Sequence, residues 1–179
     1  MAPRDPILGL NEQYAADPNP QKVNLGVGVY FDDNGKLPLL QCVQAAEKAL
    51  MDTPTARGYL PIDGIAAYDN AVKALVFGAD AEPVTSGRVA TVQAIGGTGG
   101  LKIGADFLHK LNPNAKVLIS DPSWENHRAI FQNAGFEVDT YAYYDAAKRG
   151  VNFDGMLQSL RSASPGTIAV LHVCCYNHT

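Results

Sequence analysis

Beyond Gly87 the chain alternates between short apolar segments and longer amphipathic ones, and this alternation constrains the fold more than any other feature. The short segments are rich in β-branched and aromatic residues, as buried strands are, and span 89–95, 117–119, 136–141 and 168–173. The longer segments carry apolar residues at helical spacing and span 101–111, 122–134 and 154–163. This alternation predicts an α/β fold in which helices cover a mainly parallel sheet.

The first 40 residues lack this pattern and contain five prolines: Pro3, Pro6, Pro18, Pro20 and Pro38. Proline fixes φ and removes a backbone donor, so we expect an extended arm here. An apolar, glycine-spaced run at 24–31 interrupts it. From Gln41 onward the spacing becomes helical, with apolar stripes within 42–50 and 65–76 that predict two helices.

Composition indicates a globular protein and argues against two classes of partner. Apolar residues make up 46% of the 179 residues and charged residues 18%, which excludes a disordered chain. Lys and Arg number 14 against 18 Asp and Glu, a formal net charge of −4. Because no basic cluster offsets it, electrostatics give no support to nucleic-acid or anionic-membrane binding. The longest uncharged apolar stretch, 167–176, is shorter than the roughly 18 residues of a membrane span.

Three features bear on location and completeness. Residues 1–10 contain no apolar run, so they do not resemble a secretory signal. The three cysteines, two of them adjacent at Cys174 and Cys175, make a poor disulfide framework. We therefore expect a soluble protein of a reducing compartment, the cytoplasm. The chain stops soon after 168–173 without a helix to cover that strand, so we expect an incomplete fold.

Chemistry is expected where three clusters follow predicted strands, at 96–100, 121–127 and 174–179. Ligands of open parallel sheets bind beyond the carboxyl ends of the strands. The first cluster is Gly-Gly-Thr-Gly-Gly, whose Gly96 and Gly97 allow close approach of an anion to a helix N-terminus, with Thr98 as a hydroxyl donor. A phosphate suits it, and a plain strand-to-helix turn is the alternative. Neither a P-loop nor a dinucleotide fingerprint matches, because Leu101 and Lys102 stand where those motifs need other residues.

The second cluster contains Trp124, the only tryptophan, and His127 three residues later. An indole beside a strand end can stack on an aromatic ligand or pack as core. A lone histidine can be a catalyst or a satisfied structural residue.

The third cluster allows two readings. His172, Cys174, Cys175 and His178 could form a zinc site, but adjacent cysteines on a strand point to opposite faces. Asn177 can be a turn residue or an amide donor to a ligand oxygen.

Five segments together resemble class I pyridoxal-phosphate aminotransferases, most closely the bacterial aspartate and aromatic-amino-acid type. The match runs in order over almost the whole chain and corresponds to the first half or less of such an enzyme. The segments are Asn-Leu-Gly-Val-Gly-Val-Tyr at 24–30, Tyr-Leu-Pro-Ile-Asp-Gly at 59–64, Gly-Gly-Thr-Gly-Gly-Leu at 96–101, Asp-Pro-Ser-Trp-Glu-Asn-His at 121–127 and Leu-His-Val-Cys-Cys-Tyr-Asn at 171–177.

The resemblance implies a fold and a division of the chain. The fold is the three-layer, mainly parallel α/β large domain of fold-type I pyridoxal-phosphate transferases, incomplete here. An N-terminal arm would span 1–12, a small-domain segment 13–40, and the first part of the large domain 41–179.

The resemblance also implies a cofactor site for pyridoxal 5'-phosphate. Gly96, Gly97 and Thr98 match the loop that holds the cofactor phosphate. Trp124 matches the residue that stacks on the pyridine ring and borders the substrate. Asn177 matches the amide that bonds the ring's phenolic oxygen and also contacts substrate.

Further matches concern the surroundings of that site. His127 matches a histidine behind the acid that pairs with the pyridine nitrogen, and that acid lies beyond Thr179 in the family. His172 would likewise lie behind the groups that touch the cofactor. Tyr59 matches a tyrosine that reaches the phosphate in the neighbouring subunit, so a homodimer with shared active sites is implied. Gly28 matches a backbone contact near the substrate carboxylate. The substrates would be an aromatic amino acid or aspartate, with 2-oxoglutarate as acceptor.

Two departures limit what this segment can do. The family usually has histidine before and proline after the matching asparagine, where this chain has Tyr176 and His178. The Schiff-base lysine of the family lies beyond Thr179, so no catalytic residue is predicted within the chain. The alternatives are an inactive phosphate-binding fragment and a nucleotide-binding oxidoreductase domain, which the failed fingerprint disfavours.

Overall fold

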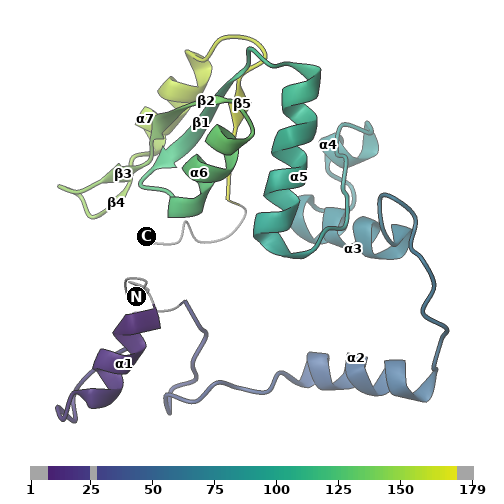
Figure 1. The fold of residues 1–179 in the computed structure, drawn as a ribbon, viewed down its shortest axis with the longest axis vertical. Helices are drawn as coiled ribbons and strands as arrows, with labels where there is room; N and C mark the ends of the chain where they lie inside the picture. The colour runs from purple at the N-terminus through teal and green to yellow at the C-terminus, as the bar shows by residue number, and fades with distance from the viewer. Residues whose placement is uncertain (1–7, 25–27, 173–179) are drawn as a thin grey trace, which may run out of the picture. The chain divides into compact units, whose positions relative to one another are not determined.

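The computed structural model describes residues 8–24 and 28–172 (Figure 1). The chain forms two compact units, Met1–Gly58 and Tyr59–Thr179. The division into 1–12, 13–40 and 41–179 stays a prediction.

The first unit contains helices α1 (Leu8–Ala16) and α2 (Gln41–Asp52). Helix α2 confirms the helix predicted around 42–50, although none of its residues is buried. Helix α1 shows that the extended conformation predicted for this stretch is wrong. Its nine residues contain no proline and include Leu, Glu, Gln and Ala, which favour helix. The prolines stand on either side of it, at Pro6 and Pro18.

Lys22 closes the end of α1. Its Nζ donates to the carbonyl oxygens of Tyr14, at 2.6 Å, and Asp17, at 2.7 Å, and lies 4.6 Å from the centre of the Tyr14 ring. The last carbonyl groups of a helix lack intrahelical partners, and a cation there also interacts favourably with the helix dipole. Lys22 therefore fixes the point at which the chain leaves the helix.

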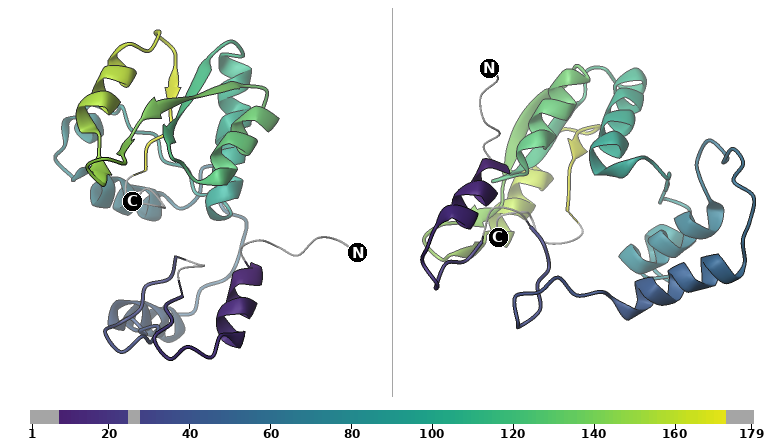
Figure 2. Two further views of the ribbon diagram at one scale, coloured as in Figure 1. Left: turned by 90° about the vertical axis from the view of Figure 1, so that its left-hand side faces the viewer. Right: turned by 60° about the horizontal axis from the view of Figure 1, so that its bottom comes forward.

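The second unit is built on a three-stranded sheet (Figures 1 and 2). Strands β1 (Lys116–Asp121), β2 (Glu137–Ala142) and β5 (Ile168–Ala169) are parallel and lie in the order β2-β1-β5. Helices α5 (Gly96–Leu111) and α6 (Glu125–Asn133) lie on one face, and α7 (Phe153–Arg161) lies on the other. The predicted three-layer α/β fold with a parallel sheet is confirmed.

Four further elements complete this unit. Helices α3 (Ala66–Phe77) and α4 (Glu82–Thr85) precede α5, and α3 confirms the helix predicted within 65–76. Strands β3 (Tyr144–Asp145) and β4 (Gly150–Val151) form a small antiparallel pair between β2 and α7.

The core gathers around β1. Val117 is fully buried and stands opposite Val138 on one side and Ile168 on the other. Ala105 of α5 and Phe131 of α6 pack in the same cluster. Each fully buried side chain of Val or Phe size contributes about 1.5–3 kcal/mol relative to exposure. The sheet, together with α5 and α6 on this face, therefore holds the carboxyl end of β1 in a fixed place.

The expectation of a strand at 89–95 is wrong. This segment has no strand partner within the described residues, and the Gln93 N–H donates instead to the carbonyl oxygen of Asp63 at 2.9 Å. A strand needs a neighbour to take its backbone hydrogen bonds, so apolar composition alone did not suffice. The last predicted strand, 168–173, is described as far as residue 172. Within those residues Ile168–Ala169 pairs as strand, with one further bond from the Val170 N–H to the Leu118 carbonyl oxygen.

Two predicted helix starts also differ from the structure. Helix α5 begins at Gly96, so the glycine run is its first turn and not a loop before it. Asp121 and Pro122 do not cap α6, because Asp121 still belongs to β1 and Trp124 is the N-cap residue. The β3–β4 pair was not predicted, since strands of two residues carry no periodicity.

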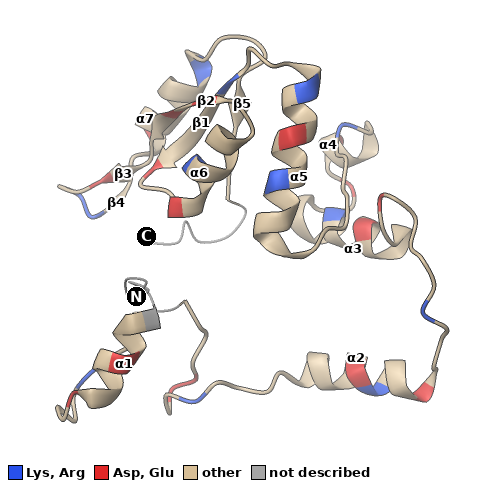
Figure 3. Cartoon of the chain, viewed as in Figure 1, with Lys and Arg blue, Asp and Glu red and all other residues tan. Residues whose placement is uncertain are grey.

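Charges of both signs are interspersed over the second unit (Figure 3). Along α5, Lys102 pairs with Asp106 one turn later, and between neighbouring strands Lys116 Nζ lies 3.1 Å from Glu137 Oε1. Such exposed pairs contribute little to stability. No helix within residues 8–24 and 28–172 is long and apolar enough to cross a membrane.

Candidate functional site

The first turn of α5 can hold an anion. Ile95 is its N-cap residue and offers no side-chain hydrogen bond, and the first turn contains no acidic residue. Gly96 has a φ of +64°, and a Cβ on Gly96 or Gly97 would meet no atom within 4 Å. The N–H groups at the start of this 16-residue helix are therefore uncapped by a side chain and approachable, at the positive end of the helix dipole. A phosphate fits this arrangement of donors, to which Thr98 adds a hydroxyl.

Trp124 stands between the end of β1 and the start of α6. Its indole is half-buried and packs against the hydrophobic core cluster. The rings of Trp124 and His127 meet edge to face, with centres 5.3 Å apart and planes at 87°. Part of the indole therefore serves as core and part stays accessible. The two interpretations offered by the sequence, stacking platform and core residue, are compatible at this position.

His127 is held by two polar neighbours. It is 4% exposed, with Ser123 Oγ 2.8 Å and His172 Nε2 3.4 Å from its Nδ1. The rings of the two histidines meet edge to face, with centres 4.7 Å apart. Burial, and then the neighbouring His172, lower the pKa of His127 below its ordinary value of 6.5. His127 is therefore neutral at physiological pH.

The polar contacts of His127 converge on one ring nitrogen. Ser123 Oγ and His172 Nε2 both face its Nδ1. A neutral ring held in this way offers one donor nitrogen and one acceptor nitrogen. It serves to orient a neighbouring group more readily than to carry charge.

The structure thus brings Trp124, His127 and His172 together at the carboxyl ends of β1 and β5. It places Gly96, Gly97 and Thr98 at the start of α5, which packs against α6. Tyr59 begins the second unit and is fully exposed, and Gly28 is an exposed residue of the first unit.

The remaining predicted residues cannot be placed in the same way. Asn177 lies outside the described residues, as do Cys174, Cys175 and His178 of the zinc alternative.

Sequence reasoning gave Ser123 no role of its own. The signal that was available is its spacing of four residues before His127, which brings two side chains together at the start of a helix.

A hollow of about 250 Å³ lies beside Trp124, lined also by Ser123, Asp121 and Arg128. Arg128 Nη1 donates to the Val138 carbonyl oxygen at 2.7 Å, which ties α6 to β2.

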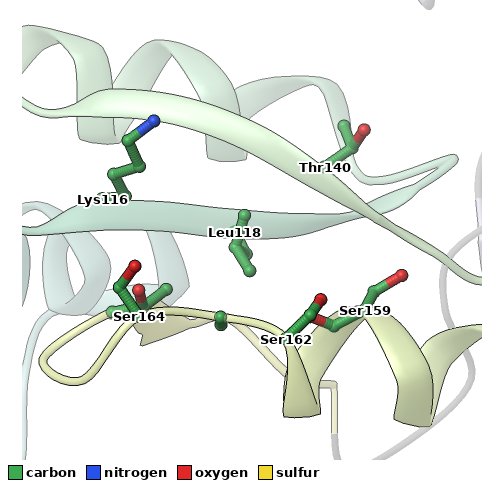
Figure 4. A pocket seen from close by; sticks show the side chains of 8 residues that line it. Lys116, Leu118, Thr140, Ser159, Ser162 and Ser164 are labelled. Atoms are coloured by element: carbon green, nitrogen blue, oxygen red, sulfur yellow. The ribbon is translucent and has the colours of Figure 1, made fainter.

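A second hollow, of about 320 Å³, lies between the sheet and α7 (Figure 4). Its lining includes Lys116, Leu118, Ser159 and Ser162, and none of the predicted site residues. Ser159 is already engaged, because its Oγ donates to the Gly155 carbonyl oxygen at 2.8 Å. The candidate site therefore lies at the other end of β1, beside Trp124.

Comparison with known proteins decides the family. The model of the class I and II aminotransferases matches residues 20–179. The chain belongs to this family. The resemblance inferred from the five sequence segments is therefore confirmed.

Individual aminotransferases show how much of such a protein is present. The chain is 60% identical over 179 residues to the aspartate aminotransferase of Pseudomonas aeruginosa, covering 100% of this chain and 45% of that protein. It is 47% identical over 176 residues to the aromatic-amino-acid aminotransferase of Escherichia coli, covering 98% and 44%. An aromatic-amino-acid aminotransferase from Burkholderia pseudomallei, solved covalently bound to pyridoxal phosphate, is 65% identical with a TM-score of 0.84, covering 99% and 44%. The chain thus spans less than half the length of these aminotransferases.

Proposed function

We propose that the protein to which this chain belongs transfers an amino group between an amino acid and a 2-oxo acid, with pyridoxal 5'-phosphate as cofactor. The observation that carries the proposal is the 60% identity of the entire chain to a named aspartate aminotransferase. The uncapped start of α5 and the half-exposed indole of Trp124 suit the two ends of that cofactor, its phosphate and its aromatic ring.

The phosphate would be held by the backbone N–H groups of Gly96 and Gly97 and by Thr98. These donors lie at the positive end of the α5 dipole, where no acidic side chain in the first turn competes for them. Tyr59 would add a hydroxyl donor to the phosphate bound in the neighbouring subunit. Its complete exposure on this chain is consistent with a role toward a second subunit.

The ring end would be oriented by side chains on the other side of the site. Trp124 would stack on the pyridine ring, and Asn177 would donate to its phenolic oxygen. His127, as a neutral ring, would orient the acid that pairs with the pyridine nitrogen, which the resemblance places beyond Thr179. When bound, pyridoxal phosphate supplies an electron sink for chemistry at the substrate α-carbon. Positioning this group is the share of the reaction that falls to the present chain.

Trp124 and Asn177 would border the substrate. The resemblance assigns Gly28 a backbone contact near the substrate carboxylate. The lysine that holds the cofactor and moves the α-proton would lie beyond Thr179. The active unit would be a homodimer in which the N-terminal arm contacts the partner, and we place it in the cytoplasm.

Aromatic amino acids and aspartate are both proposed as donors, with 2-oxoglutarate as acceptor. Relatives of both kinds match almost the whole chain, an aspartate enzyme at 60% identity and a solved aromatic enzyme at 65%. Steady-state assays of the full-length protein with tyrosine, phenylalanine, aspartate and glutamate test this. Turnover of tyrosine or phenylalanine is expected beside that of the acidic donors. Absence of turnover with either aromatic donor would remove the aromatic assignment.

Residues 1–179 alone are expected to be inactive, because the cofactor-binding lysine is not among them. Lys102 is the lysine nearest the glycine run in sequence, and it is engaged with Asp106 along α5. Expression of residues 1–179 with added pyridoxal phosphate should give no transamination. Turnover by this segment would require another lysine in the catalytic role.

A further inference from the structure

Gln93 joins two segments of the second unit that are 28 residues apart. Its side-chain Oε1 accepts a hydrogen bond from the Ile65 N–H at 3.0 Å, and its own N–H donates to the Asp63 carbonyl oxygen at 2.9 Å. Between these bonds lies Gly64, which is buried and has a φ of +100°. A Cβ on Gly64 would lie 2.3 Å from the Gln93 Cβ, so the two segments are in direct contact.

Each of these segments leads within a few residues to a proposed phosphate ligand. Gln93 stands three residues before Gly96, at the start of α5, and Asp63 stands four residues after Tyr59. A chain extends at most about 3.6 Å per residue, so the contact lies within roughly 11 Å of one ligand and roughly 14 Å of the other along the backbone.

The chain between Tyr59 and the contact has little freedom. The Gly64 N–H donates to the Pro61 carbonyl oxygen at 3.0 Å, which closes a tight turn over residues 61–64. Proline fixes φ at position 61 and restricts Leu60 before it to extended conformations. A shift of the turn relative to Gln93 would therefore be transmitted to Tyr59.

We propose that Gln93 is a positioning residue that fixes the Tyr59 segment to the segment leading into α5. It thereby sets the place of the tyrosine that serves the neighbouring subunit's phosphate site. The inference rests on the proposed function, since it assigns Gln93 a task only if Tyr59 contacts a phosphate. In a homodimer with shared sites, the contact would link the phosphate donors of one site to the tyrosine of the other.

The test is a double-mutant cycle on cofactor affinity in the full-length protein. The probes are pyridoxal phosphate and pyridoxal, which lacks the phosphate, and the readout is the ratio of their affinities. Gln93→Met keeps the length of the side chain and removes the acceptor for the Ile65 N–H, whereas Gln93→Glu keeps an acceptor. Gln132→Met is the matched control, because Gln132 is an exposed residue of α6. Gln93→Asn, too short to reach, replaces the methionine variant if that one does not fold.

Tyr59→Phe is expected to lower pyridoxal phosphate affinity about tenfold in the wild-type and Gln132→Met backgrounds, the scale of one hydrogen bond to a charged group. In Gln93→Met the same substitution should cost less than about twofold, because Tyr59 is already displaced. In Gln93→Glu the tenfold effect should return, because Glu keeps an acceptor for the Ile65 N–H. The added charge is present both with and without Tyr59→Phe, so it does not alter this comparison. Pyridoxal affinity should not change in any of these proteins.

Two results would overturn the inference, and they differ in whether the proposed phosphate site is refuted as well. A tenfold effect of Tyr59→Phe in Gln93→Met would refute the role of Gln93 and leave the proposed function intact. A wild-type protein that binds pyridoxal phosphate no better than pyridoxal would refute the proposed phosphate site, and the role of Gln93 with it.

Discussion

Gly64→Ala is expected to open the contact between segments 59–65 and 89–95. Gly64 has a φ of +100°, and an added Cβ would lie 2.3 Å from the Gln93 Cβ and 3.3 Å from its backbone nitrogen. A side chain at a φ of this kind costs of order 1–3 kcal/mol. The closest of these atoms, the Gln93 Cβ, is fixed by the backbone, so no side-chain rotation relieves its overlap. The two segments must therefore separate.

The cost of that separation follows from the bonds that it breaks. The Gln93 N–H loses the Asp63 carbonyl oxygen, and the Ile65 N–H loses Gln93 Oε1. At about 1 kcal/mol for each hydrogen bond, the opening equilibrium shifts by about 2 kcal/mol, or roughly 30-fold. Hydrogen exchange of the full-length protein, followed by mass spectrometry on peptides covering 59–66 and 88–95, measures this opening directly.

Gly78→Ala is the matched control. Gly78 also has a positive φ, +88°, but a Cβ there would meet nothing within 4 Å. This variant should carry backbone strain alone and leave exchange in both peptides unchanged. If exchange in Gly64→Ala stayed within about threefold of wild type in both peptides, the contact described for Gln93 would be wrong.

Three further predictions concern single side chains. Trp124→Ala should lower pyridoxal phosphate affinity about two- to tenfold, which corresponds to the loss of about 0.5–1.5 kcal/mol of stacking. It should also lower the urea midpoint of unfolding, because the indole packs on the core. Unchanged affinity would mean that Trp124 is a core residue alone. The pKa of His127 is lower in the folded state than the ordinary value of 6.5, so as the pH falls the unfolded chain takes up a proton before the folded chain does. The contribution of His127 to the free energy of unfolding should therefore be fully present above pH 6.5 and be lost as the pH falls below it. His127→Gln should flatten that part of the urea-midpoint profile, and an equally steep profile would contradict the assignment. Gly135→Ala would place a Cβ 2.8 Å from His109 Nε2 and disturb the edge-to-face contact of that ring with Phe136. Its cost should fall by about 1 kcal/mol in a His109→Ala background, and strict additivity in the double variant would count against this contact.

The sequence was most informative where a local pattern coincided with a buried element. Strand β1 and helix α7 were predicted close to their observed bounds, because a short apolar run is typical of a buried strand and helical spacing of apolar residues reflects which face is covered. Segment 89–95 shows the limit of this reasoning. Its composition is that of a strand, but strand formation depends on a partner, which no local pattern records.

Local signals also failed where two of them compete. Pro122 indicated a helix start, but strand β1 continues to Asp121 and the N-cap position falls on Trp124. The prolines around α1 suggested extended chain, although the nine residues between them favour helix.

The candidate site was predictable only in part, because only some of its residues are close together in the sequence. Trp124 and His127 are three residues apart, and this spacing placed them together from the sequence. His172 lies 45 residues beyond His127, so their contact depends on the order of strands in the sheet. Gln93 and Gly64 come together only in the tertiary structure, and no sequence motif indicated their contact.

The central claim is amino-group transfer through bound pyridoxal phosphate, and a half-reaction tests it most directly. The full-length protein, loaded with the cofactor and freed of excess, is mixed in turn with aspartate, glutamate, tyrosine and phenylalanine, without any 2-oxo acid acceptor. The account predicts a change in the visible absorbance of the bound cofactor and release of one equivalent of the corresponding 2-oxo acid per cofactor. Retained cofactor with no absorbance change and no 2-oxo acid from any of the four donors would contradict it.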